Sequence, residues 1–190
     1  VRVSGKLAAS TGADGLRSIN ILTQSPMAAT SPAPALTSVL FVCLGNICRS
    51  PLAEGVFRHL VEEAGLSDQF EIDSAGTGSW HVGERPDARS ILVAEQHGVG
   101  LDSRGRQVRS ADFADFDYII AMDRDNLHTL ERMRDGEGSD ALIQLLRSYE
   151  DKPDSDEVPD PYYGGASGFE NVYKMVRRSC KGLLHRLRAE

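Results

Sequence analysis

A cysteine and an arginine separated by five residues are the side chains that could do chemistry together. Cys43 and Arg49 frame the stretch Cys-Leu-Gly-Asn-Ile-Cys-Arg, and Ser50 follows it. A cysteine thiolate is a strong nucleophile, and backbone N–H groups or a helix N-terminus nearby favour that anion. A guanidinium offers a planar fork for two phosphate oxygens. The pair indicates phosphoryl transfer through a covalent cysteinyl phosphate.

The residues between Cys43 and Arg49 could form the anion-binding part of this site. Backbone N–H groups of a tight loop can converge on an oxyanion, and the helix that follows adds partial positive charge. Gly45 permits the backbone conformations that such a cup requires. The residues expected to bind phosphate are Leu44, Gly45, Asn46, Ile47, Cys48, Arg49 and Ser50.

A second candidate, Asp160, lies far along the chain in Val-Pro-Asp-Pro-Tyr-Tyr-Gly-Gly. Attack by a thiolate expels an alkoxide or phenoxide, which needs a proton donor on the far side of phosphorus. The two flanking prolines restrict the backbone and hold this carboxyl group in place. Tyr162 and Tyr163 suit an aromatic slot for a flat leaving group.

The elements around Cys43 place it at the end of a strand. The apolar run Val39 to Val42 predicts a buried strand. Ser50 and Pro51 are a favourable N-cap and first helical residue, and an apolar helical face follows them. The cysteine and arginine therefore lie in a loop between a strand and a helix.

The rest of the chain alternates strands and helices. The predicted strands are 70–74, 118–122 and 142–146, and the predicted helices begin at Pro86, Asp123 and Ser167. Ser167 and Glu170 are spaced as a capping box. The alternation predicts a three-layer α/β fold, with a four-stranded parallel sheet, doubly wound, and helices on both faces. Ligands of such sheets bind at the carboxyl ends of strands, where Cys43 lies.

Composition restricts the class of protein. The chain has 190 residues, 41% hydrophobic and 26% charged, which suits one globular domain. A net charge of −7 without a basic stripe argues against nucleic-acid binding, and no run of 18 apolar residues predicts a membrane span. The histidines lack metal-ligand spacing, so neither a metal nor a cofactor is predicted. Three cysteines without a disulfide framework favour a reducing compartment such as the cytoplasm.

Residues 1–37 differ from the rest. They are rich in Ser, Thr, Ala and Pro, contain one acidic residue, Asp14, and show no periodicity. We expect a disordered extension before a domain of residues 38–190. It could be a transit peptide for a plastid or another organelle, although its basic residues are only Arg2, Lys6 and Arg17. The alternative is upstream sequence with Met27 as the natural start.

Two strings resemble a known family, the low-molecular-weight protein tyrosine phosphatases. Val-Cys-Leu-Gly-Asn-Ile-Cys-Arg-Ser-Pro, residues 42–51, resembles their active-site signature, and Asp-Pro-Tyr-Tyr-Gly, residues 160–164, resembles their general-acid loop. The resemblance covers roughly Ser38 to the C-terminus. It implies the phosphotyrosine phosphatase I-like fold and metal-independent hydrolysis of phosphotyrosine in proteins and of aryl phosphates. We expect a monomer that binds phosphate or other oxyanions in this site.

The resemblance also implies roles for individual residues. Cys43 would be the nucleophile, Arg49 would hold the phosphate, and Asp160 would act first as general acid and then as base. Ser50 would hydrogen-bond the Cys43 sulfur, and Asn46 would fix the shape of the cup.

Further residues follow from the same resemblance. Tyr162, Tyr163 and, by a looser match, Trp80 would wall the phenyl ring of the substrate. Cys48 would form a reversible disulfide with the nucleophile, although it could also simply fill space. His97 and Asp123 match a structural pair that affects the electrostatics of the site.

A thiol-dependent arsenate reductase on the same scaffold is the alternative, because arsenate mimics phosphate. Such enzymes pass oxidation to further cysteines, whereas here only Cys180 lies downstream, on a predicted buried stripe of the last helix. Asp160 between two prolines also favours hydrolysis. A catalytically silent phosphate-binding or redox-sensing module is disfavoured by the presence of nucleophile, arginine and acid together.

Overall fold

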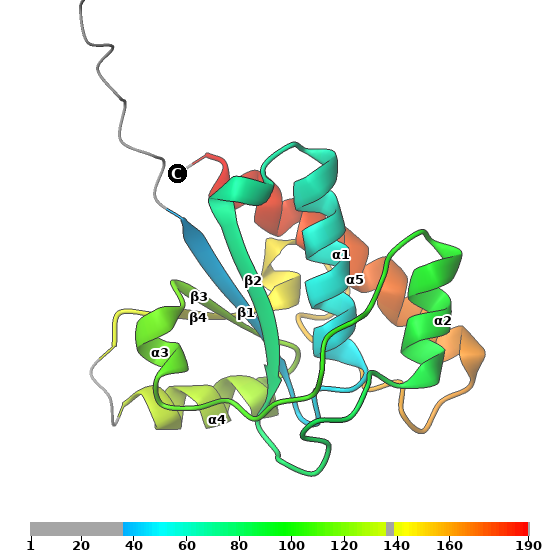
Figure 1. Cartoon of the computed structure of the whole chain (residues 1–190), viewed down its shortest axis with the longest axis horizontal. Coiled ribbons are helices and arrows are strands. Elements are labelled where there is room, and N and C mark those ends of the chain that lie inside the picture. The colour runs from blue at the N-terminus through cyan, green and yellow to red at the C-terminus, as the bar shows by residue number, and fades with distance from the viewer. Residues whose placement is uncertain (1–35, 136–138, 190) are drawn as a thin grey trace, which may run out of the picture. The chain divides into compact units, whose positions relative to one another are not determined.

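A single parallel sheet organises the chain. The computed structural model describes residues 36–135 and 139–189 (Figure 1). Four strands pair in the order β2-β1-β3-β4. They are β1 (Thr37–Cys43), β2 (Phe70–Gly76), β3 (Tyr118–Ala121) and β4 (Leu142–Leu145). All three pairings are parallel, which confirms the predicted sheet.

Helices connect the strands and cover both faces of the sheet. They are α1 (Arg49–Glu63), α2 (Ala88–Gln96), α3 (Asp112–Asp115), α4 (Arg124–Arg134) and α5 (Ala166–Leu187), with short 3₁₀ helices η1 (Ser67–Gln69) and η2 (Leu146–Tyr149). In Figure 1, α1, α2 and α5 lie on one side of the sheet, and α3 and α4 lie on the other. The predicted three-layer α/β class is confirmed.

Strand β1 is buried on both faces because its side chains alternate between two hydrophobic clusters. Val39 and Phe41 pack with apolar residues of α1 and α5. Leu40 and Val42 pack with apolar residues of α3, α4 and β3. This double burial explains why the strand reads in the sequence as a continuous apolar run.

The carboxyl edge of the sheet is where functional loops meet. The chain leaves β1 for β2 on one side, and later returns to pair β3 on the other side of β1, so a switch point lies beside Cys43. Met122, just after β3, donates its N–H to Val42 O at 3.0 Å, and Val158 donates to Met122 O at 2.8 Å. The segment that carries Asp160 is thereby brought to the end of β1.

Two predicted helix caps are wrong. Helix α1 begins at Arg49 after Cys48, so Ser50 lies inside its first turn, and its hydroxyl is engaged elsewhere. Helix α5 begins at Ala166 after Gly165, without a side-chain cap, so Ser167 is not the N-cap. Both caps were predicted from local spacing, and at Ser50 the hydroxyl lies against the Cys43 sulfur instead of capping the helix.

The predicted extension of residues 1–37 lies outside the described residues, apart from Leu36 and Thr37, and Thr37 is already the first residue of β1. Over the described part of the chain, no helix combines the length and apolar character needed to cross a membrane.

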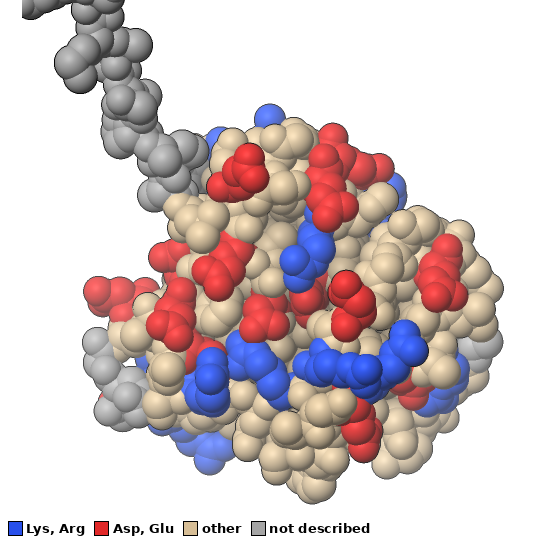
Figure 2. All heavy atoms as spheres, in the orientation of Figure 1, with Lys and Arg blue, Asp and Glu red and all other residues tan. Residues whose placement is uncertain are grey.

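Charge is unevenly distributed over the surface. Figure 2 shows Lys and Arg gathered in a band across one face, although the sequence predicts no basic stripe. The band lies over the segment between α2 and α3, which contains Arg104, Arg106 and Arg109. Arg106 and Arg109 are paired with carboxylates, so part of this positive charge is neutralised.

Candidate active site

The sulfur of Cys43 lies at the base of a tight loop, here named the cysteine loop (residues 43–50). Cys43 is 3% exposed. Its Sγ is 3.0 Å from Ser50 Oγ, and the backbone N–H of Asn46 donates to it at 3.3 Å. Both groups can donate to a sulfur anion, so the loop can stabilise a thiolate.

Asn46 fixes the shape of the cysteine loop. Its backbone has φ 53°, a left-handed conformation that asparagine tolerates better than most residues. Its Nδ2 donates to Ser50 Oγ and to Ser74 Oγ, both at 2.9 Å, and its Oδ1 accepts from the N–H of Arg106 at 2.9 Å. Every polar group of this 2% exposed side chain therefore has a partner.

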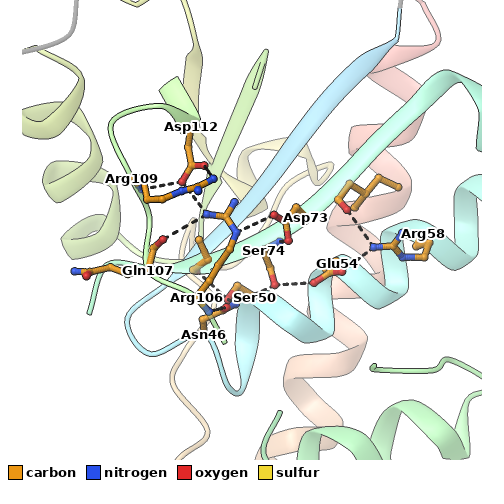
Figure 3. Close-up of polar contacts among 12 residues, drawn as sticks. Asn46, Ser50, Glu54, Arg58, Asp73, Ser74, Arg106, Gln107, Arg109 and Asp112 are labelled. Atoms are coloured by element: carbon orange, nitrogen blue, oxygen red, sulfur yellow. Dashed lines mark hydrogen bonds and ion pairs between the residues drawn. The ribbon is translucent and has the colours of Figure 1, made fainter. Parts of the chain in front are cut away.

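The network continues away from the sulfur along α1 (Figure 3). Ser74 donates its hydroxyl to Glu54 at 2.7 Å, and Arg58 holds the other oxygen of Glu54 at 2.7 Å. Ser50 accepts a hydrogen bond from Asn46. Its own hydroxyl can therefore donate to the Cys43 sulfur or to Ala75 O, which is 3.3 Å away. The network thus orients the serine as a donor.

Arg106 braces the same loop from the opposite side. In Figure 3 its guanidinium lies between Asp73 and Asp112, which it contacts at 2.8 Å and 2.9 Å. Burial lowers the pKa of Arg106, but Asp112 and Asp73 outweigh burial and raise it. Asp112 is completely buried and also accepts from the N–H of Arg109 at 2.8 Å.

Arg49 is almost completely buried and has three partners. Its Nη1 donates to Asp123 at 2.6 Å and to Val158 O at 3.1 Å, and its Nη2 donates to Asp160 at 2.9 Å. Burial lowers the pKa of Arg49, but Cys43, Asp160 and Asp123 outweigh burial and raise it. The guanidinium therefore stays charged and is held in a fixed plane.

His97 and Asp123, which the resemblance matched to a structural pair, do not contact each other in the structure. Asp123 contacts Arg49, whereas His97 hydrogen-bonds Glu170 at 3.2 Å and stacks on Tyr173 with ring centroids 3.9 Å apart. Asp123 lies at the N-terminus of α4 beside the sheet edge, while His97 follows α2 and faces α5. Only Asp123 belongs to this site.

Asp160 lies in a second loop, here named the aspartate loop (residues 158–164). Its Oδ1 accepts from the N–H of Tyr162 at 3.0 Å, which forms a local turn. Tyr162 and Tyr163 stack edge to face at 5.1 Å, and Tyr163 is 97% exposed. A carboxyl group and two aromatic rings are therefore presented together beside the cysteine loop.

The two loops enclose a pocket of about 240 Å³. Its lining contains eleven residues: Cys43, Leu44, Gly45, Ile47, Cys48, Arg49, Trp80, His81, Asp160, Tyr162 and Tyr163. The structure thus brings together the predicted nucleophile, arginine, acid and three aromatic residues. Asn46 and Ser50 lie behind this lining and contact the sulfur instead.

Cys48 is a buried thiol next to the helix start. Burial, reinforced by the negative charge of Asp87, raises the pKa of Cys48 to about 12. Cys43, Cys48 and Cys180 are all free. Cys48 is therefore protonated near neutral pH, whereas the Cys43 sulfur is contacted by the Ser50 hydroxyl and by the N–H of Asn46.

The sequence did not single out several residues that build the site: Glu54, Ser74, Arg106 and Asp112. No local motif marks Ser74 and Arg106, because each contacts Asn46 from 28 and 60 positions away, respectively. The only signal is Glu54, an acidic residue directly after the apolar positions Leu52 and Ala53 of α1. Over the described residues, no group of three or more His, Cys, Asp or Glu side chains is arranged to hold a metal ion.

This arrangement can carry out substitution at phosphorus. The Cys43 sulfur, a buried guanidinium and a carboxyl group line one small pocket. The sulfur can attack, the guanidinium and loop N–H groups can hold the oxygens, and the carboxyl group can protonate a leaving oxygen.

Comparisons with known proteins agree with this chemistry. The family model described as "Low molecular weight phosphotyrosine protein phosphatase" matches residues 38–190. The low molecular weight protein-tyrosine-phosphatase of Streptomyces coelicolor is 47% identical over 154 residues, which cover 80% of this chain and 94% of that protein.

Two solved structures are also similar. The protein tyrosine phosphatase from Entamoeba histolytica, crystallised with Hepes in its active site, has a TM-score of 0.75 and 39% identity, covering 80% of this chain and 97% of that one. The Drosophila arginine phosphatase DARP has a TM-score of 0.75 and 42% identity, covering 78% of this chain and 96% of that one.

Proposed function

The chain belongs to the low molecular weight phosphotyrosine protein phosphatases, and on that premise we propose that it hydrolyses phosphotyrosine in proteins, and aryl phosphate monoesters, through a cysteinyl phosphate. The observation that carries the proposal is the Cys43 sulfur, contacted by Ser50 and by the N–H of Asn46, in a pocket also lined by Arg49 and Asp160.

In the first step, the Cys43 thiolate attacks phosphorus in line with the bond to the leaving oxygen. The S–P bond forms as the P–O bond breaks, and the carboxyl proton of Asp160 passes to the departing phenolate. Loop N–H groups from Leu44 to Arg49 and the Arg49 guanidinium hold the three equatorial oxygens. Asp123 and Val158 O keep the guanidinium in plane.

In the second step, water hydrolyses the cysteinyl phosphate. The Asp160 carboxylate accepts a proton from the attacking water, and the thiolate of Cys43 leaves. The same donors that stabilise the resting sulfur, Ser50 and the N–H of Asn46, assist its departure. The residues of this chain supply each proton transfer.

The rim of the pocket supports a preference for a flat leaving group. Trp80, Tyr162 and Tyr163 line it, and Trp80 is 72% exposed, so its ring is available to a substrate. We propose that these rings pack against the phenyl group of phosphotyrosine. The natural partners would then be phosphotyrosine-containing proteins bound by a monomer, without nucleic acid or membrane.

We also propose redox regulation in a reducing compartment such as the cytoplasm, or in an organelle if residues 1–37 direct the chain there. Oxidation of Cys43 gives a sulfenic acid, which the neighbouring Cys48 could trap as a disulfide, with loss of water. Peroxide should inactivate the protein and dithiothreitol should restore it, whereas Cys48→Ala should recover less fully. Equal recovery of both proteins would remove Cys48 from this role.

An arsenate reductase is not favoured. Its chemistry requires a further accessible thiol to accept oxidation, but Cys180 is completely buried in α5, where its sulfur contacts Ala53 O at 3.8 Å. Burial raises the pKa of this thiol, which makes it a poor nucleophile.

The decisive experiment compares substrates with the purified full chain. We expect turnover of phosphotyrosine peptides and p-nitrophenyl phosphate, and at least about a hundredfold lower kcat/KM for phosphoserine peptides, whose leaving group is poorer and not aromatic. Phosphoarginine and arsenate with a thiol complete the panel. A higher kcat/KM for phosphoarginine, or arsenate reduction without phosphatase turnover, would overturn the proposal.

A further inference from the structure

The first turn of α2 contacts both loops of the site. Towards the cysteine loop, the N–H of Asp87 donates to Ile47 O at 2.7 Å, and the fully buried Ser90 hydroxyl donates to Cys48 O at 3.3 Å. Towards the aspartate loop, the contacts come from Arg89. This turn is therefore a physical link between the segments that carry the proposed nucleophile and the proposed acid.

Arg89 divides its donors between an anchor and the aspartate loop. Its Nε and Nη2 hold the two carboxylate oxygens of Asp87 at 3.0 Å and 2.8 Å, as a bidentate pair. Its Nη1 donates to Tyr162 O at 3.0 Å and to Gly164 O at 3.4 Å. The guanidinium also lies over the Phe169 ring, 4.5 Å from its centroid.

The anchor is well suited to holding a cation in one orientation. Asp87 caps α2 by accepting from the N–H of Arg89 at 2.8 Å, so its carboxylate is fixed by the same residue that it fixes. Its side chain is 14% exposed. The Arg89 hydrogen bonds lower the pKa of Asp87, so the pair persists well into the acid range.

Asp160 lies between two attachment points of its loop. On one side, the fully buried Val158 donates to Met122 O and accepts from Arg49. On the other side, Arg89 holds the carbonyls of Tyr162 and Gly164. The first attachment leads to the sheet edge and the second to α2, and the Asp160 carboxylate itself pairs with Arg49 at 2.9 Å, so the position of Asp160 depends on all three.

We propose that Arg89, held by Asp87, is a positioning residue that fixes Asp160 over the Cys43 sulfur for protonation of the leaving oxygen. The role rests on the proposed phosphatase function. Arg89 acts through the backbone of the aspartate loop, because the described residues that line the pocket do not include it. It is thus distinct from Arg49, whose guanidinium faces the pocket.

The role predicts a dependence on the leaving group. Nitrophenolate departs readily without a proton, whereas phenolate needs one, so a misplaced acid affects phenyl phosphate far more than p-nitrophenyl phosphate. The kcat/KM value reports this step, because it covers events up to release of the phenol. Binding of inorganic phosphate reports the cysteine loop alone.

The test uses Arg89→Met and Arg89→Lys in the full chain, with Arg85→Met as the matched control. Arg85 is an exposed arginine four residues earlier, and it has no hydrogen bond or ion pair to the described residues. For Arg89→Met we expect about a 10- to 100-fold loss of kcat/KM with phenyl phosphate, since small misplacements of a reacting group cost that much. The loss with p-nitrophenyl phosphate should stay within about threefold.

Arg89→Lys should restore only part of the loss, because one ammonium cannot hold the Asp87 fork and both carbonyls. Asp160→Asn should show the same leaving-group pattern with a larger amplitude, which identifies the missing function as proton donation. The inhibition constant of phosphate should be unchanged in Arg89→Met. Asp87→Asn, which keeps Arg89 but weakens its anchor, should show the pattern in milder form.

Equal losses with both substrates, or no loss in either Arg89 variant, would overturn the positioning role. If Arg89→Met does not fold, as judged by its melting curve, the same comparison with Asp87→Asn decides. A wild-type protein without phosphatase turnover would refute the proposed function itself. If the wild-type protein is active but Arg89→Met loses kcat/KM equally with phenyl phosphate and p-nitrophenyl phosphate, only this inference is refuted.

Discussion

At the scale of single residues, the site depends on the direction of each hydrogen bond. Asn46 can only donate through Nδ2, and it donates to Ser50 and Ser74. The Glu54 carboxylate can only accept, and it accepts a hydrogen bond from the Ser74 hydroxyl. Because Ser50 accepts from Asn46, its own hydroxyl can donate to the Cys43 sulfur or to Ala75 O, so the loop can stabilise an anion on that sulfur.

Replacing Cys43 by Ser should separate binding from chemistry. We expect turnover of p-nitrophenyl phosphate to fall by at least about 10⁴-fold, because a serine hydroxyl in this loop has no base to activate it. Phosphate binding, measured by calorimetry, should persist because Arg49 and the loop N–H groups remain. Turnover near the wild-type rate would show that the sulfur is not the nucleophile.

Replacing Ser50 by Ala should slow reaction of the Cys43 sulfur. A hydrogen bond to a charged group contributes about 1.5–3 kcal/mol, so alkylation by iodoacetate at pH 6 should slow about 10- to 100-fold. Ser67→Ala, in the exposed helix η1, is the control and should react at the wild-type rate. An unchanged rate in Ser50→Ala would mean that the 3.0 Å contact does not stabilise the anion.

At the scale of elements, the segment before α3 stabilises the cysteine loop from outside. The N–H of Arg106 holds Asn46, and its guanidinium is fixed by Asp73 of β2 and by Asp112 of α3. Nearby, Gly76 donates its N–H to Arg106 O, and Val108 donates its N–H to Gly76 O. The loop is therefore held by secondary structure on two sides.

Asp112→Asn should weaken this brace. The substitution keeps the size of the side chain but removes a buried charge that faces Arg106, so we expect a loss of about 2–3 kcal/mol in the free energy of unfolding by urea. The kcat value should fall as well, since Asn46 loses support. Asp115→Asn, at an exposed position of the same short helix, is the control. It should change the free energy of unfolding by no more than about 0.5 kcal/mol and should leave kcat at the wild-type value.

At the scale of the whole molecule, a network of ion pairs joins η2 and the residues that follow it to α5. Arg147, 2% exposed, contacts Glu150 at 3.0 Å and also pairs with Asp154. Glu150 accepts from Ser179 of α5 at 2.6 Å. This network lies between η2 and α5, so it connects the sheet to the segment that leads toward the aspartate loop.

Stability should therefore fall in acid through Glu150. Burial raises its pKa, but hydrogen bonds from Ser179 and Arg147 outweigh burial and lower it. The unfolded chain then binds a proton more readily, so this stability is fully present above the unfolded value of about 4.3 and is lost as pH falls through the folded pKa.

Glu150→Gln should be less stable than wild type at pH 7 and should show a shallower loss of stability below about pH 5, as measured by urea unfolding. Glu62→Gln, at an exposed position of α1, should keep the wild-type pH dependence. A wild-type slope in Glu150→Gln would show that other carboxylates carry the acid sensitivity.

The sequence by itself determined the sheet and the chemistry of the cysteine loop. Buried parallel strands are continuous apolar runs, so β1 and β3 were predicted from the local sequence pattern alone. The identities of Cys43, Arg49 and Asp160 followed from motifs whose chemistry is local. Topology placed Cys43 at a strand end, the leaving-group chemistry and the resemblance placed Asp160 opposite it, and their catalytic roles remain a prediction.

The tertiary structure alone decided what holds these groups in place. Ser74 and Arg106 contact Asn46 of the cysteine loop from 28 and 60 positions away, and Arg89 reaches the aspartate loop 73 positions away. No spacing rule marks such contacts, because a hydrogen bond depends on separation in space. The cap predicted at Ser50 failed for the same reason: a hydroxyl takes the partner that folding brings nearest, and at Ser50 this partner is a sulfur.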